Sequence, residues 1–267
     1  MTVRRLDDTV RTLGGPERGQ QRKGTGHMCS NCEKNGIARR DLLKFGVASV
    51  LAAGLGGISR PVRAATGAPT ELSPEEALKE LKDGNQRYVT HPELCNIDLE
   101  KQRSEVAGHQ APWATIISCA DSRVPPELIF GGHGVGELFV ARNAGNLVDT
   151  ATIGTVEYGA AVLGSPLIVI LAHSSCGAVK AACDVVKKNA TYPGKIGPMI
   201  EPIVPAALAV QKEAGDFVEN TAKESARRTV KRLSTQSKLI TKLVKAGKVK
   251  VTSAIYDLQT GAVTYLD

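Results

Sequence analysis

Hydrophobic and polar positions change their period several times along this chain of 267 residues. Continuous apolar, β-prone runs at 114–118 and 167–172 predict buried strands, and the run at 138–142 predicts another. Apolar residues spaced three or four positions apart predict helices at 74–90, 126–129, 150–163, 177–189, 201–214 and 216–246. Alternation over 249–258, a Thr-Gly turn and a final strand at 262–266 predict an antiparallel hairpin.

Local start and stop signals agree with this division. Ser73 precedes a proline and two acidic residues, which is typical of a helix start, and Gly247 is a suitable helix stop. Residues 190–200 are rich in proline and glycine and predict a loop. Strands that alternate with helices favour an α/β fold, with a mostly parallel central sheet flanked by helices, an N-terminal helical arm and a C-terminal antiparallel edge hairpin.

The first 64 residues have the features of a targeting segment. Arg39 and Arg40 precede an uncharged, Gly/Ala-rich stretch at 45–59, and Val62-Arg63-Ala64 follows it as a small-residue cleavage site. We expect twin-arginine export, cleavage after Ala64, and a periplasmic or extracellular mature protein. The apolar stretch is shorter than the roughly 20 residues that span a bilayer, although a retained anchor is the alternative. Met28 offers a second possible start.

The basic excess of the chain lies entirely in this leader. The net charge is +7 overall; residues 1–64 carry 12 basic and 5 acidic side chains, whereas residues 65–267 carry 22 of each. A basic chain would ordinarily suggest nucleic acid or anionic lipid as a partner. Because the mature part has no such excess, we expect no nucleic-acid partner.

Cys119, His173 and Cys176 are the residues that point most directly to chemistry. Two thiolates and an imidazole are the ligand types of zinc. Two of the predicted strands end directly before Cys119 and His173, and α/β proteins build their sites at the carboxyl ends of strands. Three ligands leave a fourth position open, as in catalytic zinc sites. The sequence therefore predicts one Zn²⁺ per chain.

Around these ligands the chain resembles the β-class carbonic anhydrases. Their pattern is Cys-x-Asp-x-Arg followed about fifty residues later by His-x-x-Cys, and here Cys119 and His173 are 54 positions apart. The resemblance runs from about Leu78 to the C-terminus. It includes Gly-Asn-x-Arg-Tyr at 84–88, Arg-Asn-Ala-Gly-Asn at 142–146 and Glu-Tyr-Gly at 157–159.

The resemblance implies a reaction and a catalytic pair. The reaction is the reversible hydration of carbon dioxide to bicarbonate and a proton by zinc-bound hydroxide. Asp121 and Arg123 match a dyad in which the carboxylate accepts a hydrogen bond from that hydroxide while the guanidinium holds the carboxylate. The family also has a closed form in which this aspartate binds zinc, and the sequence leaves open which form this chain adopts.

A substrate cleft is also implied, because several positions match residues that line it in the plant-type branch. The predicted substrate-binding residues are Gln110, Phe139, Ala144, Tyr158 and Gly177. Another branch has a tryptophan at a regulatory bicarbonate site where this chain has Ile116, so we expect no such site. His109 and His133 are candidates for proton transfer by residue type alone.

The family assembles as dimers or multiples of dimers, and the N-terminal helix embraces the neighbour. We therefore expect a helical arm at 65–110, a zinc-binding catalytic domain at 111–267, and a homodimer or a higher multiple. The partners expected besides the substrate are a second copy of the chain and the twin-arginine export machinery.

Three alternatives remain on the sequence alone. A carbon disulfide or carbonyl sulfide hydrolase uses the same zinc site. A non-catalytic protein could close a structural zinc site with Cys183 or Asp121 as fourth ligand, and a nucleic-acid-binding zinc module conflicts with the neutral mature charge. Cys95 and Cys183 are not among the predicted three ligands; packing or a disulfide between them are both compatible with the sequence.

Overall fold

The computed structural model describes residues 68–94 and 99–266. The leader at 1–64 and Cys95 lie outside the described residues, so the predictions made on them stay predictions. Within the described residues no helix is long and apolar enough to cross a membrane.

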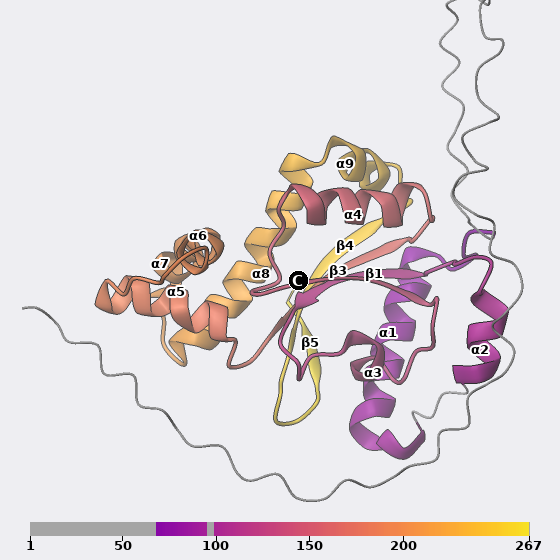
Figure 1. Ribbon diagram of the computed structural model, residues 1–267, viewed down its shortest axis with the longest axis horizontal. Helices are drawn as coiled ribbons and strands as arrows, with labels where there is room; N and C mark the ends of the chain where they lie inside the picture. Colours follow the sequence, from indigo (N-terminus) through magenta and orange to yellow (C-terminus); the bar gives the residue numbers. More distant parts are fainter. Residues whose placement is uncertain (1–67, 95–98, 267) are drawn as a thin grey trace, which may run out of the picture. The chain divides into compact units, whose positions relative to one another are not determined.

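The core is a sheet of five strands in the order β2-β1-β3-β4-β5 (Figure 1). The strands are β1 (Ala114–Cys119), β2 (Leu138–Asn143), β3 (Leu167–His173), β4 (Lys250–Tyr256) and β5 (Val263–Tyr265). The first four run parallel and β5 pairs antiparallel with β4. Every residue of β1 and β3 is buried, as expected for central parallel strands with both faces covered. The predicted α/β fold with an edge hairpin is confirmed.

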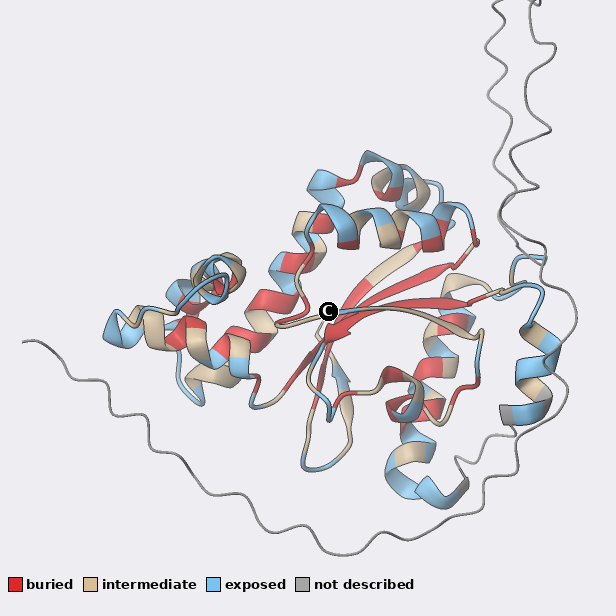
Figure 2. Cartoon of the chain, viewed as in Figure 1, coloured by how far each residue is buried: buried red, intermediate tan, exposed pale blue. Residues whose placement is uncertain are grey.

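Helices cover both faces of this sheet. On one face α1 (Pro74–Thr90) and α3 (Pro126–Ile129) pack against alternate residues of β1 and β3. On the other face lie α4 (Thr150–Ala161) and α8 (Phe217–Gln236). Helix α5 (Gly177–Lys188) packs against α8, and α9 (Lys238–Lys245) packs against α4 and α8. Figure 2 shows the buried residues on the strands and on the helix sides turned toward them. Successive side chains of a strand point to opposite faces of the sheet. Ile116 therefore packs in the core on the α1 side and Ile117 in the core on the α8 side.

Helix α1 belongs to the core of its own chain. It begins with a capping box, in which the Ser73 side chain accepts from the Glu76 main chain and Glu76 accepts from the Ser73 main chain. Leu81 is fully buried, and the Asn85 amide donates to the carbonyls of Ile129 and Gly261. The predicted boundary between a helical arm and a catalytic domain at residue 110 stays a prediction. In this structure α1 packs against the sheet of its own chain and hydrogen-bonds residues that follow that boundary.

The predicted single helix at 216–246 is wrong. The chain becomes extended at Ser237, whose side chain caps α9 by accepting from the Ile240 main chain at 3.0 Å and donates to Glu157 at 2.6 Å. Serine competes with the helix for hydrogen bonds, which is why it starts a second helix here.

Two further differences concern short helices. The predicted loop at 190–200 contains α6 (Ile196–Ile200), and the predicted helix at 201–214 is a 3₁₀ turn (Glu201–Ile203) followed by α7 (Val204–Val210). An additional helix, α2 (Leu99–Val106), and a 3₁₀ turn (Pro92–Leu94) precede β1. These elements are too short and too polar, or too rich in proline, for hydrophobic periodicity to reveal them.

Candidate metal centre

The three predicted ligands meet at the carboxyl ends of two neighbouring strands. Cys119 is the last residue of β1, His173 is the last residue of β3, and Cys176 is the N-cap of α5. Their ligand atoms all lie within 4.8 Å of one another, and all three residues are buried. The two sulfur atoms are 3.9 Å apart. Parallel neighbours bring residues 54 positions apart to the same edge of the sheet.

The His173 ring is oriented so that one nitrogen faces the two sulfur atoms. Its Nδ1–H donates to the Ser174 carbonyl at 2.9 Å, which leaves Nε2 as the nitrogen with a free lone pair. Nε2 is buried and has no hydrogen-bond partner among the described residues. A buried polar atom without a partner costs free energy, and a metal ion bound there would satisfy it. The donor set and this orphaned nitrogen fit zinc.

The Cys119 and Cys176 sulfur atoms are within hydrogen-bonding distance of each other. The hydrogen bond between them lowers the pKa of Cys119, with a further contribution from the Gly145 main chain, whose N–H donates to Cys119 Sγ at 3.4 Å. The same contact, together with burial, raises the pKa of Cys176. A bound divalent cation would favour the thiolate form of both, since thiols coordinate metals only after losing their protons.

Asp121 and Arg123 form a bidentate pair beside the ligands. Arg123 Nε donates to Oδ1 at 2.9 Å and Nη2 donates to Oδ2 at 2.7 Å, and the Arg123 main chain also donates to Oδ1. These bonds hold the pKa of the Asp121 carboxyl well below its usual range. Oδ2 lies 4.0 Å from His173 Nε2, so the carboxylate stands next to the ligand cluster while both its oxygens are bound to arginine.

Sequence comparison identifies the family. A model of the carbonic anhydrase family matches residues 114–263, which is more than half of the chain. The chain belongs to the carbonic anhydrase family. Carbonic anhydrase 2 of Mycobacterium tuberculosis is 35% identical over 195 residues, which cover 73% of this chain and 94% of that protein.

Structural comparison places the chain in the β class of this family. The β-carbonic anhydrase of Coccomyxa, solved with acetazolamide, has a TM-score of 0.55 and 26% identity, and the match covers 71% of this chain and 86% of that one. The β-carbonic anhydrase CcaA has a TM-score of 0.53 and 27% identity, with 71% and 95% covered. The finer assignment to a plant-type branch stays a prediction.

Two residues that support the ligands were not predicted as parts of the site. Arg142, on β2, donates from Nε to the Cys119 carbonyl at 2.9 Å and from Nη2 to the Asp121 carbonyl at 2.6 Å. Ser174 supplies the carbonyl that orients the His173 ring. Both act on or through main-chain atoms, which a search for reactive side chains does not detect. The only sequence signal for Arg142 is its place in the 142–146 family motif.

The predicted substrate-binding residues divide into two groups. Ala144 and Gly177 lie beside the ligands, because Ala144 precedes Gly145 and Gly177 follows Cys176. Ala144 also lines a cavity of about 340 Å³ with Lys195, Pro198 and Met199.

The other group lies away from the ligands of the same chain. Phe139 pairs with Thr115, four residues before Cys119, which is roughly 13 Å along the strand. The Tyr158 ring on α4 lies 6.1 Å from that of Phe139, and Gln110 precedes the amino end of β1. One chain therefore does not bring these three residues to its own metal centre.

The two histidines considered for proton transfer differ in environment. His109 is exposed and precedes β1, whereas His133 is buried, bonds Glu137 at 2.8 Å and packs edge-on against Trp113. Trp113 stands at the amino end of β1 and Cys119 at its carboxyl end. His133 is therefore a core residue at the end of the sheet away from the ligands.

Replacing Gly145 with alanine is expected to destabilise the protein by about 2–4 kcal/mol. Gly145 has a φ of +85°, and a β-carbon there would lie 2.8 Å from Ile203 Cδ1 and 3.3 Å from Ala178 Cβ. Urea unfolding measures the change. The matched control is Gly154→Ala within α4, where a β-carbon meets nothing within 4 Å, and a gain of about 0.5–1 kcal/mol is expected from helix propensity. Equal effects of both variants would contradict the packing argument.

Proposed function

We propose that this chain catalyses the reversible hydration of carbon dioxide to bicarbonate and a proton, with one zinc ion held by Cys119, His173 and Cys176. The observation that carries the proposal is the buried, unpartnered His173 Nε2 facing two thiols, with an arginine-held carboxylate 4.0 Å away. Zinc in such a site is a Lewis acid that lowers the pKa of a coordinated water toward about 7.

The side chains of this protein would then orient the reactants. Asp121 stays ionised at neutral pH because Arg123 occupies both its oxygens, so it can accept a hydrogen bond and cannot donate one. A carboxylate that accepts from a nucleophilic water fixes the direction of that water's lone pair. Arg123, which is largely exposed, also lines an open cleft of about 680 Å³ with Ser174 and Lys180.

The deciding experiment is stopped-flow carbon dioxide hydration by the purified protein at neutral pH and near pH 8.5, with zinc quantified on the same sample. Fast hydration with about one zinc per chain supports the proposal. Release of sulfide from carbon disulfide or carbonyl sulfide without hydration would favour the hydrolase alternative. Full zinc occupancy with neither activity would favour a structural site.

One observation disfavours the structural site. Cys183 does not reach the ligand cluster, because its sulfur lies 3.4 Å from Thr221 Oγ1 between α5 and α8. Within the described residues, the metal-binding cluster consists of the three predicted ligands. Asp121 is engaged by Arg123, so a fourth ligand would require this pair to separate.

We also propose that the chain works as a homodimer joined at the β2 side of the sheet. β2 is an edge strand whose residues are mostly half-buried, and Tyr158 on the neighbouring α4 and Val162 directly after it are exposed. A second copy packed there would cover these residues. It would also bring Gln110, Phe139 and Tyr158 toward the metal centre of the partner, which their own chain does not do.

Tyr158→Arg is expected to shift the protein toward monomer and to lower hydration at least about tenfold, because it places a charge in the proposed interface. Light scattering and stopped-flow hydration on the same sample measure both effects. Leu208→Arg on α7, where leucine is 49% exposed, is the matched control and should change neither. A fully active Tyr158→Arg monomer would refute the shared cleft.

The proposed destination is outside the cytoplasm, by twin-arginine export. It is supported by Arg39, Arg40 and the uncharged stretch at 45–59, all in the leader. Changing both arginines to lysine should leave the precursor uncleaved inside the cell, because the export machinery reads the arginine pair and not charge alone. Fractionation of cells followed by N-terminal sequencing checks this. Unchanged export of the lysine variant would contradict the assignment.

A further inference from the structure

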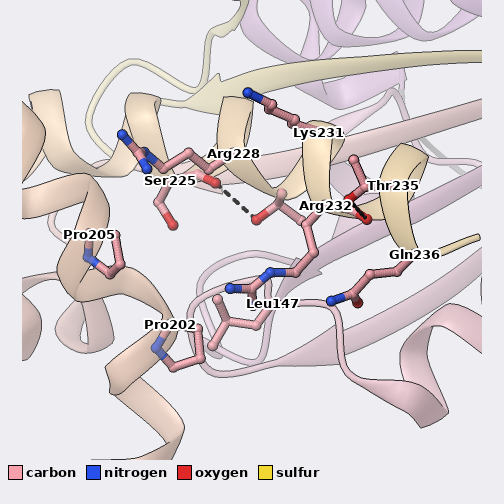
Figure 3. Close-up of a pocket in the computed structure, with 10 residues that line it drawn as sticks. Leu147, Pro202, Pro205, Ser225, Arg228, Lys231, Arg232, Thr235 and Gln236 are labelled. Carbon is pink, nitrogen blue, oxygen red and sulfur yellow. Dashed lines mark hydrogen bonds between the residues drawn. The ribbon is translucent and has the colours of Figure 1, made fainter.

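Another cavity, which none of the three predicted metal ligands lines, lies between α8 and the segment formed by the 3₁₀ turn and the start of α7. It has a volume of about 380 Å³, and Leu147, Pro202 and Pro205 form its apolar wall. The opposite wall is formed by α8. Its lining residues are Ser225, Arg228, Thr229, Lys231, Arg232, Thr235 and Gln236. Figure 3 shows Arg232 extended into this space toward Leu147, with the Gln236 amide beside it.

Of the five cations of α8, Lys231 and Arg232 have no partner among the described residues, and Lys231 is exposed. Lys223 pairs with Glu219, Arg228 pairs with Glu224 at 2.7 Å, and Arg227 donates to the Leu266 carbonyl. Arg232 is half-buried, yet among the described residues no carboxylate or carbonyl accepts from its guanidinium. The side chains that line the cavity also include no acidic residue. A partly desolvated guanidinium without a counter-charge is suited to bind an anion.

We propose that this cavity binds a small organic acid, with its carboxylate on Arg232 and its apolar part against Leu147, Pro202 and Pro205. The guanidinium fork matches the two oxygens of a carboxylate, and the Gln236 amide can add a further donor. The volume is near the lower end of small-molecule sites, which sets the size of the ligand at about that of one aromatic ring. The apolar wall favours an organic anion over an inorganic one.

The cavity is connected to the metal centre by the 143–147 turn. The Asn143 side chain makes two hydrogen bonds to the main chain of Leu147, each 2.7 Å long. Its Nδ2 donates to the Leu147 carbonyl, and its Oδ1 accepts from the Leu147 N–H. Between these residues lies Gly145, whose N–H donates to Cys119 Sγ. The ligand would therefore contact a turn that supports a metal ligand while remaining outside the metal centre.

Titration of the full, zinc-loaded protein with benzoate by isothermal calorimetry tests the site. Arg232→Leu should weaken benzoate binding at least about tenfold, the effect expected for losing charged hydrogen bonds. Arg227→Leu is the matched control, because it removes the same side chain from an exposed position of α8 that does not line the cavity. It should leave benzoate affinity unchanged.

Two further probes keep the test independent of how the variants fold. Benzamide, a neutral molecule of the same shape, should bind the wild-type protein at least about tenfold more weakly than benzoate, and inorganic phosphate should also bind more weakly because it cannot use the apolar wall. No saturable benzoate binding, or equal affinity in wild type and Arg232→Leu, would overturn the proposal. Equal affinity in wild type and Arg232→Leu would mean that benzoate binds at another place, such as the metal centre. This conclusion does not depend on the result of the hydration assay.

Discussion

Cys176→Ala is expected to lose zinc and with it essentially all carbon dioxide hydration. Cys176 is buried at the N-cap of α5, with its sulfur 3.9 Å from that of Cys119 and its main chain fixed at the start of the helix. Removing one of three protein ligands leaves two, which is too few to hold the ion in an open site. Metal analysis after dialysis against a weak chelator should show far less than the one zinc per chain of the wild type, and stopped-flow hydration should fall to the buffer background.

The matched control is Cys183→Ala. Cys183 is also buried and lies on the same helix, but its sulfur contacts Thr221 and not the ligand cluster. This variant should keep full zinc and hydration, with a cost in stability of about 1–2 kcal/mol for the lost packing. If both variants lost zinc to the same extent, the ligand assignment would be wrong and the effect would be one of folding.

Asp121→Asn is expected to slow hydration about a hundredfold or more while zinc stays bound. The amide keeps the shape of the carboxylate but loses its negative charge and presents a donor where a pure acceptor stood. It also pairs poorly with the Arg123 guanidinium, which now forms two bonds to the carboxylate oxygens. The loss should appear in both kcat and kcat/KM, because the carboxylate orients the nucleophile rather than binding the substrate.

Arg123 provides the test of whether the two residues act together. Arg123→Leu should be similarly slow, and the double variant should be little worse than either single one, because each substitution alone already destroys the pair. Ser122→Ala, an exposed position between them, should retain full activity. Independent, multiplicative losses in the double variant would contradict a dyad, and loss of zinc in Asp121→Asn would make the residue a ligand instead.

The sequence was most informative where a residue type and a strand end coincide. The strands at 114–118 and 167–172 were predicted almost to the residue, because buried parallel strands are continuous apolar runs. Cys119, His173 and Cys176 were predicted as metal ligands from their residue types and their places directly after these strands, and the structure brings them together. The break at Ser237 was missed because the apolar periodicity continues across it, and only the hydrogen bonds to Ile240 and Glu157 show that the helix restarts.

The amino-acid sequence therefore determined the family, the α/β class and which three residues meet at the candidate metal centre, since each depends on residue type and local spacing. Tertiary structure alone decided which atoms are free to act: that His173 directs Nε2 toward the sulfur atoms, that Arg142 holds the main chain of Cys119 and Asp121, and that Phe139 lies far from its own metal centre. The same holds for the unpartnered Arg232. These properties depend on contacts between residues distant in sequence, and the local pattern of residues does not specify which distant residues come into contact.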